Sequence, residues 1–548
     1  MVNAYAQNSA VSIPSTATGT ERILAAIDIG TNSIHMVVVR IETALPSFTI
    51  IAKEKDTVRL GERDPHTGNL TVEAMARSLA TLQRCRELAK SFNAEQIVTV
   101  ATSAVREARN GRDFLRQVNS EVGLFVNLIS GQEEARRIYL GVLSGMDFNR
   151  EPHIIIDIGG GSTELILGDS HEPRSLSSTK VGAVRLTSEF VSTDPISNSE
   201  FKYLQAYIRG MLERPVEELQ AHLKAGEKQR LVGTSGTIET LATMHAIQKL
   251  GMLPNPLTGY QMSRQDLKEM LNHLASLNCT QRSQLPGMSE RRSEIIVAGA
   301  LILLEAMNLL GVESIIVAER ALREGIIVDW MLSHGLILDR LRYQSQVRQR
   351  SVIKVAKKYQ VNLEYSNRVA NFALILFDHT QGVLHNWGEE ERELLWAAAI
   401  LHNCGVYISH ASHHKHSYYL IRYGELLGFT EAETEVIANL ARYHRKSTPK
   451  KKHDNYNNLL SKEHRQIVNQ LSAILRLAVA LDRRQIGAIK QLESEYSQKT
   501  RQLHLKLTPA KADDECVLEL WNLDYKKGVF EEEYGVKVVA TLEAATCC

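Results

Sequence analysis

The fold is decided by the stretch His153-Ile-Ile-Ile-Asp-Ile-Gly-Gly-Gly-Ser-Thr-Glu-Leu-Ile-Leu-Gly168. A continuous apolar run that stops at glycine and polar residues is typical of a buried strand entering a loop. Apolar residues resume after Glu164 and predict a partner strand. The stretch therefore predicts a strand, a glycine loop and a second strand.

The same unit occurs earlier in the chain. The apolar run 23–27 stops at Asp28-Ile-Gly-Thr-Asn-Ser33, and residues 36–41 resume as a second strand. This internal repeat is weak, but its two copies are separated by about the length of a domain, and it therefore predicts two similar lobes. A third loop of this type, Leu231-Val-Gly-Thr-Ser-Gly-Thr237, follows another short apolar run.

Glycine loops that follow buried strands expose backbone N–H groups, and such groups bind phosphate. One such loop is weak evidence, because glycines at strand ends are common turns, but three on one chain are stronger. The chain lacks GxxxxGK[ST], and Glu164 occupies the last position of a G-x-G-x-x-G match, so P-loop and dinucleotide sites are excluded. The candidate phosphate-binding residues are Asp28, Gly30, Thr31, Asn32 and Ser33; Gly159, Gly160, Gly161, Ser162 and Thr163; and Gly233, Thr234, Ser235, Gly236 and Thr237.

Two carboxylates, Asp157 and Glu164, bracket the second loop. They would repel a phosphate unless a cation lay between them, and Mg²⁺ commonly binds one or two carboxylates together with phosphate oxygens. We therefore expect Asp157 and Glu164 to bind Mg²⁺ or Mn²⁺. The alternative is that Glu164 points to solvent from a strand edge. A further pair, Glu133-Glu134, follows Ser130 in the pattern of an ordinary helix capping box.

Five motifs together closely resemble the exopolyphosphatase / guanosine pentaphosphate phosphohydrolase family. They are Asp28-Ile-Gly-Thr-Asn-Ser33, Ser130-Gly-Gln-Glu-Glu-Ala-Arg136, Asp157-Ile-Gly-Gly-Gly-Ser-Thr-Glu164, Gly233-Thr-Ser-Gly-Thr237 and Leu322-Arg-Glu-Gly325. The family belongs to the actin-like ATPase and sugar kinase superfamily. The resemblance implies an α/β fold with two ribonuclease-H-like lobes, at 22–137 and 138–330, around a cleft.

The resemblance also implies roles for single residues. Glu134 resembles the family's catalytic base, which activates the attacking water. Asp157 and Glu164 resemble its metal ligands, and Arg106 matches an arginine expected to contact phosphate.

The remainder of the chain changes character after the expected lobes. Helical patterns at 361–380, 389–401, 431–443 and 463–482 predict an all-α domain at 331–487. Alternation at 502–507, 516–520 and 536–541 predicts strands of a small α+β domain at 488–548. Residues 1–21 are expected to form a flexible tail.

The helical region resembles the HD-like domain of the family's long form, but its expected metal ligands are incomplete. The histidine–aspartate doublet is replaced by His402-Asn403, and neutral Asn cannot supply the anionic ligand. Asp482 remains a candidate for the distant aspartate. We expect no second hydrolase site, with the clustered histidines structural or in contact with substrate. These are His402, His410, His413, His414, His416 and His444.

Charge and composition limit the class of partner. The 548 residues contain 64 Lys+Arg and 63 Asp+Glu, which argues against a protein that coats nucleic acid by bulk charge. The segment Arg442–Arg465 nevertheless contains eight basic and two acidic residues. Such runs are usually solvated surface. In an enzyme of polyphosphate, Lys450, Lys451 and Lys452 are expected to hold the far end of the chain.

The leading hypothesis is a metal-dependent exopolyphosphatase that releases orthophosphate from inorganic polyphosphate. A guanosine pentaphosphate phosphohydrolase is the alternative within the same class. An ATP-dependent kinase, a non-catalytic sensor of phosphate polymers and a nucleic-acid binder are the competing classes. We expect a cytoplasmic homodimer without membrane segments or specific nucleic-acid binding. Six cysteines without a CxxC pair fit a reducing compartment, and Cys547-Cys548 fits a plain tail.

Overall fold

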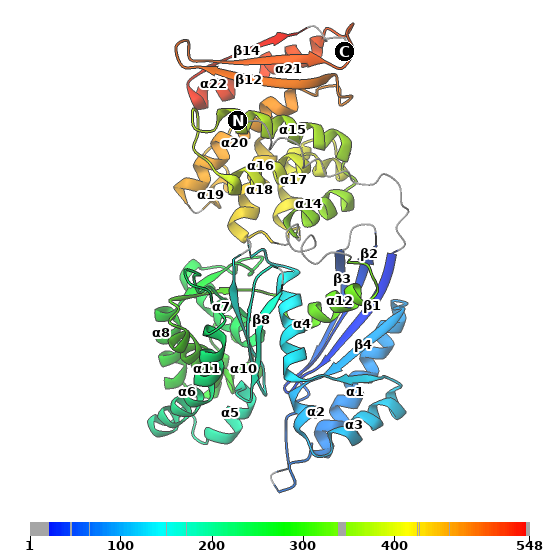
Figure 1. Ribbon diagram of the computed structural model, residues 1–548, viewed down its shortest axis with the longest axis vertical. Helices are drawn as coiled ribbons and strands as arrows, with labels where there is room; N and C mark the ends of the chain where they lie inside the picture. The colour runs from blue at the N-terminus through cyan, green and yellow to red at the C-terminus, as the bar shows by residue number, and fades with distance from the viewer. Residues whose placement is uncertain are drawn as a thin grey trace.

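The computed structural model describes residues 21–43, 47–64, 66–148, 151–170, 172–337, 347–424, 426, 428–459 and 461–543. Two α/β lobes lie side by side, with a helical region above them and a three-stranded sheet at the far end (Figure 1). Residues 1–20 of the expected tail and Cys547-Cys548 lie outside the described residues, whereas Glu21, its expected last residue, begins the first strand. No helix within these ranges is long and apolar enough to cross a membrane.

The first lobe is built on a five-stranded sheet in the order β3-β2-β1-β4-β5. Strands β1 to β3 are antiparallel, whereas β4 pairs in parallel with β1 and β5 pairs in parallel with β4. The strands are β1 (Glu21–Ile29), β2 (Ile34–Glu42), β3 (Ser47–Asp56), β4 (Gln96–Ala101) and β5 (Val126–Leu128). The helices are α1 (Val72–Ser91), α2 (Ser103–Glu107), α3 (Gly111–Gln117), η1 (Val118–Val122) and α4 (Gly131–Leu143).

The second lobe repeats this sheet with one additional strand. Its order, β8-β7-β6-β9-β11-β10, matches the first lobe up to β11. The strands are β6 (His153–Ile158), β7 (Thr163–Gly168), β8 (Pro173–Thr179), β9 (Leu231–Thr234), β10 (Gln261–Ser263) and β11 (Ser314–Val317). The helices are α5 (Ala183–Phe190), α6 (Asn198–Gln220), α7 (Gly236–Leu250), α8 (Arg264–Ser276), α9 (Cys279–Ser283), α10 (Glu290–Ser293) and α11 (Ile296–Leu310). The helix that follows β11, α12 (Leu322–Ser333), packs on β1 and β2 of the first lobe (Figure 1). The predicted duplication is therefore present in the strand order.

The helical region and the terminal sheet share one continuous hydrophobic core. The helical elements are α14 (Val347–Lys358), α15 (Leu363–Thr380), α16 (Glu389–Leu401), η2 (Cys404–Tyr407), α17 (His413–Arg422), α18 (Glu431–Tyr443), α19 (Asp454–Asn457) and α20 (Lys462–Ala480). The terminal elements are β12 (Ile489–Ser497), β13 (Gln502–Pro509), α21 (Val517–Lys526), α22 (Gly528–Tyr534) and β14 (Lys537–Leu542).

One predicted strand is wrong. The segment Cys516–Leu520 lies mostly in helix α21 and forms no strand. Its alternating residues favour a strand, but burial follows the helical period, because Glu519 and Leu523 are buried while Val517 is exposed. Buried Glu519 accepts hydrogen bonds from Arg484, and this ion pair fixes the inward face of the helix.

Helices α4 and α12 cross at two glycines and connect the lobes. A methyl group on Gly325 would overlap the carbonyl oxygen of Arg137, and one on Gly141 would overlap the carbonyl oxygen of Ala321. The two backbones therefore touch directly. Since α4 also carries Glu134, this crossing sets the position of the expected catalytic base.

We expect Gly325→Ala to destabilise the chain by several kcal/mol, because a rigid backbone crossing cannot absorb the overlap. Gly210→Ala in α6 is the matched control, since nothing lies within 4 Å of its added methyl group. That change should raise the free energy of unfolding by about 0.5–1 kcal/mol through helix propensity. Urea unfolding of both variants is the measurement. If Gly325→Ala were as stable as the unmodified chain, the direct contact between the α4 and α12 backbones at Gly325 would be contradicted.

Candidate active site

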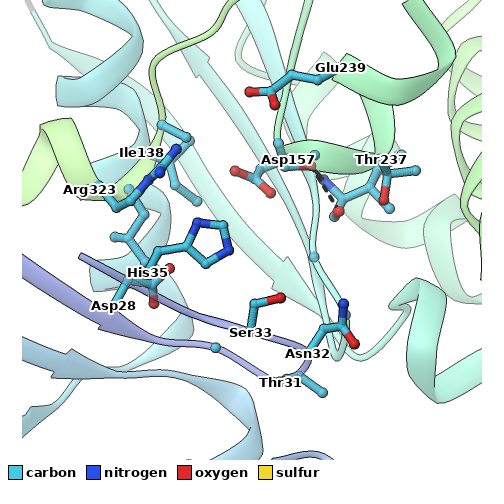
Figure 2. Close-up of a pocket in the computed structure, with 18 of the residues that line it drawn as sticks. Asp28, Thr31, Asn32, Ser33, His35, Ile138, Asp157, Thr237, Glu239 and Arg323 are labelled. Atoms are coloured by element: carbon cyan, nitrogen blue, oxygen red, sulfur yellow. Dashed lines mark hydrogen bonds between the residues drawn. The ribbon is translucent and has the colours of Figure 1, made fainter. Parts of the chain in front are cut away.

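A cavity of about 670 Å³ lies between the two lobes. Asp28 from β1 and Asp157 from β6 lie on opposite walls, with Thr31, Asn32 and Ser33 along one side (Figure 2). Most of the sequence-predicted residues line this cavity: Asp28, Gly30, Thr31, Asn32, Ser33, Glu134, Asp157, Gly159, Gly160, Gly161, Ser162, Glu164, Ser235, Gly236 and Thr237. The fold thus brings together three loops that are distant in the sequence.

The phosphate loops of the two lobes also touch each other. A methyl group on Gly160 would lie 3.1 Å from the Thr31 Cβ, and one on Gly161 would lie 2.7 Å from the Thr31 Oγ1. The Oγ1 of Thr31 lies 3.1 Å from the Oγ of Ser103. Gly160 and Gly161 are therefore required for contact between the lobes as well as for any close approach of phosphate.

Asp157 and Glu164 are direct cross-strand partners in the antiparallel pair β6–β7. Such partners share one face of a sheet, with Cβ atoms about 4.5–5.5 Å apart. Glu164 is only 1% exposed, so it does not point to solvent from an edge. Ser178 donates a hydrogen bond of 2.7 Å to its Oε1.

The carboxyl groups of the cleft are costly to ionise together. Burial, with repulsion from Glu164 and then Asp28, holds the pKa of Asp157 well above its usual range. Burial also raises the pKa of Glu164 to about 7, despite hydrogen bonds from Ser178 and Ser162. Asp28 behaves similarly, because burial raises its pKa to about 7 against the attraction of Arg323. These carboxyl groups therefore ionise together readily only when a cation lies close to them.

Glu134 lies in the first turn of α4, which Ser130 caps by accepting a hydrogen bond from the backbone N–H of Glu133. Glu134 is 7% exposed and lines the cavity. Arg106 donates a hydrogen bond of 3.2 Å to the Glu134 Oε2 and another of 2.8 Å to the Ile129 carbonyl. Burial and repulsion from Glu164 nevertheless hold the pKa of Glu134 well above its usual range. A carboxylate with a raised pKa is a stronger proton acceptor.

The donor set fits a divalent cation. The buried Oδ1 of Asp28 has no hydrogen-bond partner, and Asp157 and Glu164 face the same cavity. In the described parts of the chain, no group of three or more Asp, Glu, His or Cys side chains could hold a metal ion alone. Hard oxygen ligands from substrate phosphate would have to complete the coordination, as is common for Mg²⁺.

Several cavity residues were missed by the sequence reasoning. His35, Lys53, Lys55, Arg292 and Arg323 line the cleft and place cationic or imidazole groups beside the carboxylates. Burial, followed by repulsion from nearby cations including Arg323, lowers the pKa of His35 to about 2, so its imidazole is neutral. Two signals were available. Arg323 lies inside a quoted family motif, and His35 follows Asp28 at the spacing that separates Glu164 from Asp157.

Some predicted residues do not line this cavity. Thr163 donates a hydrogen bond to the Val181 carbonyl, and the Thr234 hydroxyl donates to the Arg320 carbonyl. Gly233 packs against Ile315. Arg106 lines a second cavity, together with Ser130 and Ser178. Lys450, Lys451 and Lys452 are exposed in the helical region, on the loop between α18 and α19.

In the HD-like helical domain, the candidate metal ligand Asp482 is already paired with an arginine. Arg368 donates a hydrogen bond of 2.7 Å to the Oδ2 of Asp482, whose side chain is fully buried. The Nδ1 of His402 donates a hydrogen bond of 2.6 Å to the Ala399 carbonyl. Asp482 is thus neutralised by a side chain of the same domain.

The paired sheets and facing phosphate loops define an actin-like, two-lobed enzyme fold. The chain belongs to the Ppx/GppA phosphatase family, whose sequence model matches residues 37–334, while domain III of the same phosphatases matches residues 347–527. The expected family, its fold and its hydrolase class are therefore confirmed.

Individual relatives agree with this assignment. The chain is 32% identical over 472 residues to a guanosine-5'-triphosphate,3'-diphosphate pyrophosphatase of Vibrio vulnificus, covering 85% of this chain and 88% of the relative. It is 32% identical over 467 residues to the protein of that name from Aliivibrio fischeri, covering 84% and 86%. The solved structure of an exopolyphosphatase from Cytophaga hutchinsonii matches with a TM-score of 0.53 and 26% identity, covering 58% of this chain and 100% of that one.

We expect Asp28→Asn to flatten the pH dependence of stability in EDTA. The folded-state pKa of Asp28 is raised from 3.8 to about 7, so the folded chain binds more protons than the unfolded chain between these values. Its contribution to stability therefore falls as pH rises through this window, by about 4 kcal/mol at most. Urea unfolding at pH 5 and pH 8 measures this loss, which should be smaller in the variant. Asp524→Asn, at an exposed carboxylate of α21, is the control. An unchanged pH dependence in Asp28→Asn would contradict the burial of this carboxyl group.

Proposed function

We propose that this chain hydrolyses the terminal phosphoanhydride bond of guanosine pentaphosphate and releases orthophosphate. The observation that carries the proposal is the meeting of three phosphate-type loops around Glu134 in one cleft. The choice of a nucleotide substrate is supported by relatives of that name, which match most of the chain at 32% identity.

The residues of the cleft can support an in-line attack by water. Glu134 would accept a proton from the water as its oxygen bonds to the terminal phosphorus. The bridging P–O bond would break, and the shortened nucleotide would leave with the bridging oxygen. Arg106 would act as a positioning residue through its hydrogen bond to Glu134. Backbone N–H groups at Gly160 and Gly161 would stabilise charge on the transferred group.

Asp157 and Glu164 are the residues that would hold Mg²⁺ or Mn²⁺, with Asp28 close to the same cavity. When bound, such a cation would supply positive charge that offsets the phosphate oxygens. Arg292 and Arg323 line the same cavity, where their guanidinium groups can bind the remaining phosphates.

Exopolyphosphatase activity, the leading expectation from the sequence, is the second candidate. It is favoured by the match to the Cytophaga hutchinsonii exopolyphosphatase and by the exposed lysines at 450–452. A homodimer stays a prediction.

The two substrates are to be compared side by side at equal phosphate concentration, with and without Mg²⁺. We expect a higher kcat/KM for guanosine pentaphosphate than for long polyphosphate, and little phosphate release in EDTA. Turnover of polyphosphate alone would shift the assignment to the second candidate. Turnover of neither substrate would refute a hydrolase.

Glu134→Gln supplies the inactive control of this assay. General-base catalysis contributes about 10²–10⁴ in rate, so release from either substrate should fall by that factor while nucleotide binding persists. Glu133→Gln is the matched variant, because Glu133 is next in sequence and pairs with Arg136 and Arg137 at the surface of the helix. Its turnover should stay close to that of the unmodified chain.

A triple Lys450→Ala, Lys451→Ala, Lys452→Ala variant tests whether the basic loop holds long chains. We expect loss of processive degradation of long polyphosphate at low salt, with turnover of guanosine pentaphosphate unchanged. The difference should shrink at high salt, because exposed charges are screened. Lys499→Ala, an exposed lysine of the terminal sheet region, is the control. Full processivity of the triple variant at both salt concentrations would remove the loop from substrate binding.

A further inference from the structure

A second cluster of charged groups lies where the helical region meets the terminal sheet, at the degenerate HD-like position. We call it the histidine–lysine site and define it by His402, His444, Arg445, Arg476, Arg483 and Lys526. The rings of His402 and His444 pack with centroids 5.0 Å apart, and His413 stacks on His444 at 5.5 Å. Lys526 comes from α21, so the site joins two parts of the chain.

Among the residues that the structure describes, no carboxylate forms an ion pair with a cation of this site. Arg476 is 4% exposed and donates hydrogen bonds only to the carbonyls of Tyr443, Lys446 and Ser447 among the described residues. Burial lowers its pKa to about 10. Burial, followed by repulsion from Arg476, Arg483 and Arg445, lowers the pKa of Lys526 to about 8. No hydrogen bond or ion pair engages Lys526 within the described part of the chain.

The nearby carboxylate cannot provide the missing charge. Asp482 is committed to Arg368 at 2.7 Å and also accepts a hydrogen bond from the backbone N–H of Gly487. A buried cation without a partner costs several kcal/mol, and an apolar side chain of similar volume would avoid that cost. Of the clustered cations, Arg476 is buried and Arg445 and Lys526 are half-buried, and like charges held together in this way favour an anionic ligand.

The imidazole groups leave hydrogen-bonding capacity unused. His444 donates through Nδ1 to the Ala441 carbonyl at 2.6 Å, and its Nε2 has no partner among the described residues. His414 is 4% exposed, and its buried Nδ1 is also without a partner. Helix α17 begins beside these rings at His413, and its first turn has no side-chain cap. Uncapped N–H groups at a helix start add to an anion site.

The site is reachable from solvent. Arg483 is exposed, while Arg445 and Lys526 are partly exposed, so the cations lead from the surface to the buried histidines. The exposed Lys446 continues the positive charge toward the loop of Lys450 to Lys452. Guanidinium groups favour phosphoryl oxygens, with which they form paired charge-assisted hydrogen bonds.

We propose that the histidine–lysine site binds a phosphoryl group of an anionic ligand without a metal ion, through Lys526, Arg445 and Arg483 above the paired histidines. The ligand class is a phosphate, an oligophosphate or the diphosphate end of a nucleotide. This binding is separate from hydrolysis in the cleft, so the proposal does not depend on the cleft's substrate.

Lys526→Met in the full chain is the principal test, with thermal unfolding measured in EDTA. The probes are inorganic phosphate, tripolyphosphate and guanosine 5'-diphosphate 3'-diphosphate. Without a probe, the variant should unfold at a higher temperature, because a half-buried charge that three arginines repel is gone. Some probes will stabilise the unmodified chain through this site. Lys526→Met should bind each of them about tenfold more weakly, as expected when a charged hydrogen bond is removed. The probe that loses most identifies the source of the phosphoryl group.

Lys527→Met is the matched control, since Lys527 is the next residue and pairs with Asp524 at the surface. Its ligand-induced rise in melting temperature should equal that of the unmodified chain. Arg483→Gln at an exposed position gives a second variant should Lys526→Met fail to fold. Turnover in the cleft should be unchanged in both. Equal stabilisation of the unmodified chain, Lys526→Met and Arg483→Gln by all three probes would overturn the proposal, as would the absence of stabilisation by any probe.

Discussion

Mutual repulsion among the carboxylates of the cleft is the constraint on which the site depends. Asp157 and Glu164 face each other across β6 and β7, Asp28 approaches from the other lobe, and Glu134 is added from α4. Burial raises the free energy of ionising each carboxyl group, and each group that ionises makes it harder for its neighbours to ionise. Arg106 offsets part of this charge through Glu134. The remaining imbalance favours cations and loops rich in N–H groups.

At one corresponding strand pair that faces the cleft, the two lobes carry side chains of different charge. In the second lobe the cross-strand partner of Asp157 is Glu164, whereas in the first lobe the partner of Asp28 is His35. A carboxylate at residue 35 would have added a further negative charge to the same cavity. The neutral imidazole avoids this, and the duplicated sheets can therefore close on one another.

The parts of the site that local sequence patterns determine could be predicted. The parts that depend on contacts between residues distant in the sequence could not. Local patterns were enough for the strand–loop–strand units, the repeat and the bracketing of a glycine loop by Asp157 and Glu164. The strand register was not available, so the common face of these two carboxylates could not be established from spacing. Lys55 and Arg292 enter the cavity only because the lobes pack together, and no local pattern marks them. Helix α21 was missed because Glu519 is buried by a distant partner, Arg484.

The helical region is tied to the cleft by direct backbone contacts. Arg422, at the end of α17, donates a hydrogen bond of 2.7 Å to the carbonyl of Asn255, which lines the cavity. The N–H of Gly428 donates to the Gly145 carbonyl just beyond α4. Helix α17 also begins at His413, beside the histidine–lysine site. Helix α17 thus extends from the proposed histidine–lysine site to a residue that contacts the rim of the cleft. Near-neutral net charge for the whole chain is therefore compatible with two separate centres of opposite sign, one acidic in the cleft and one basic in the helical region.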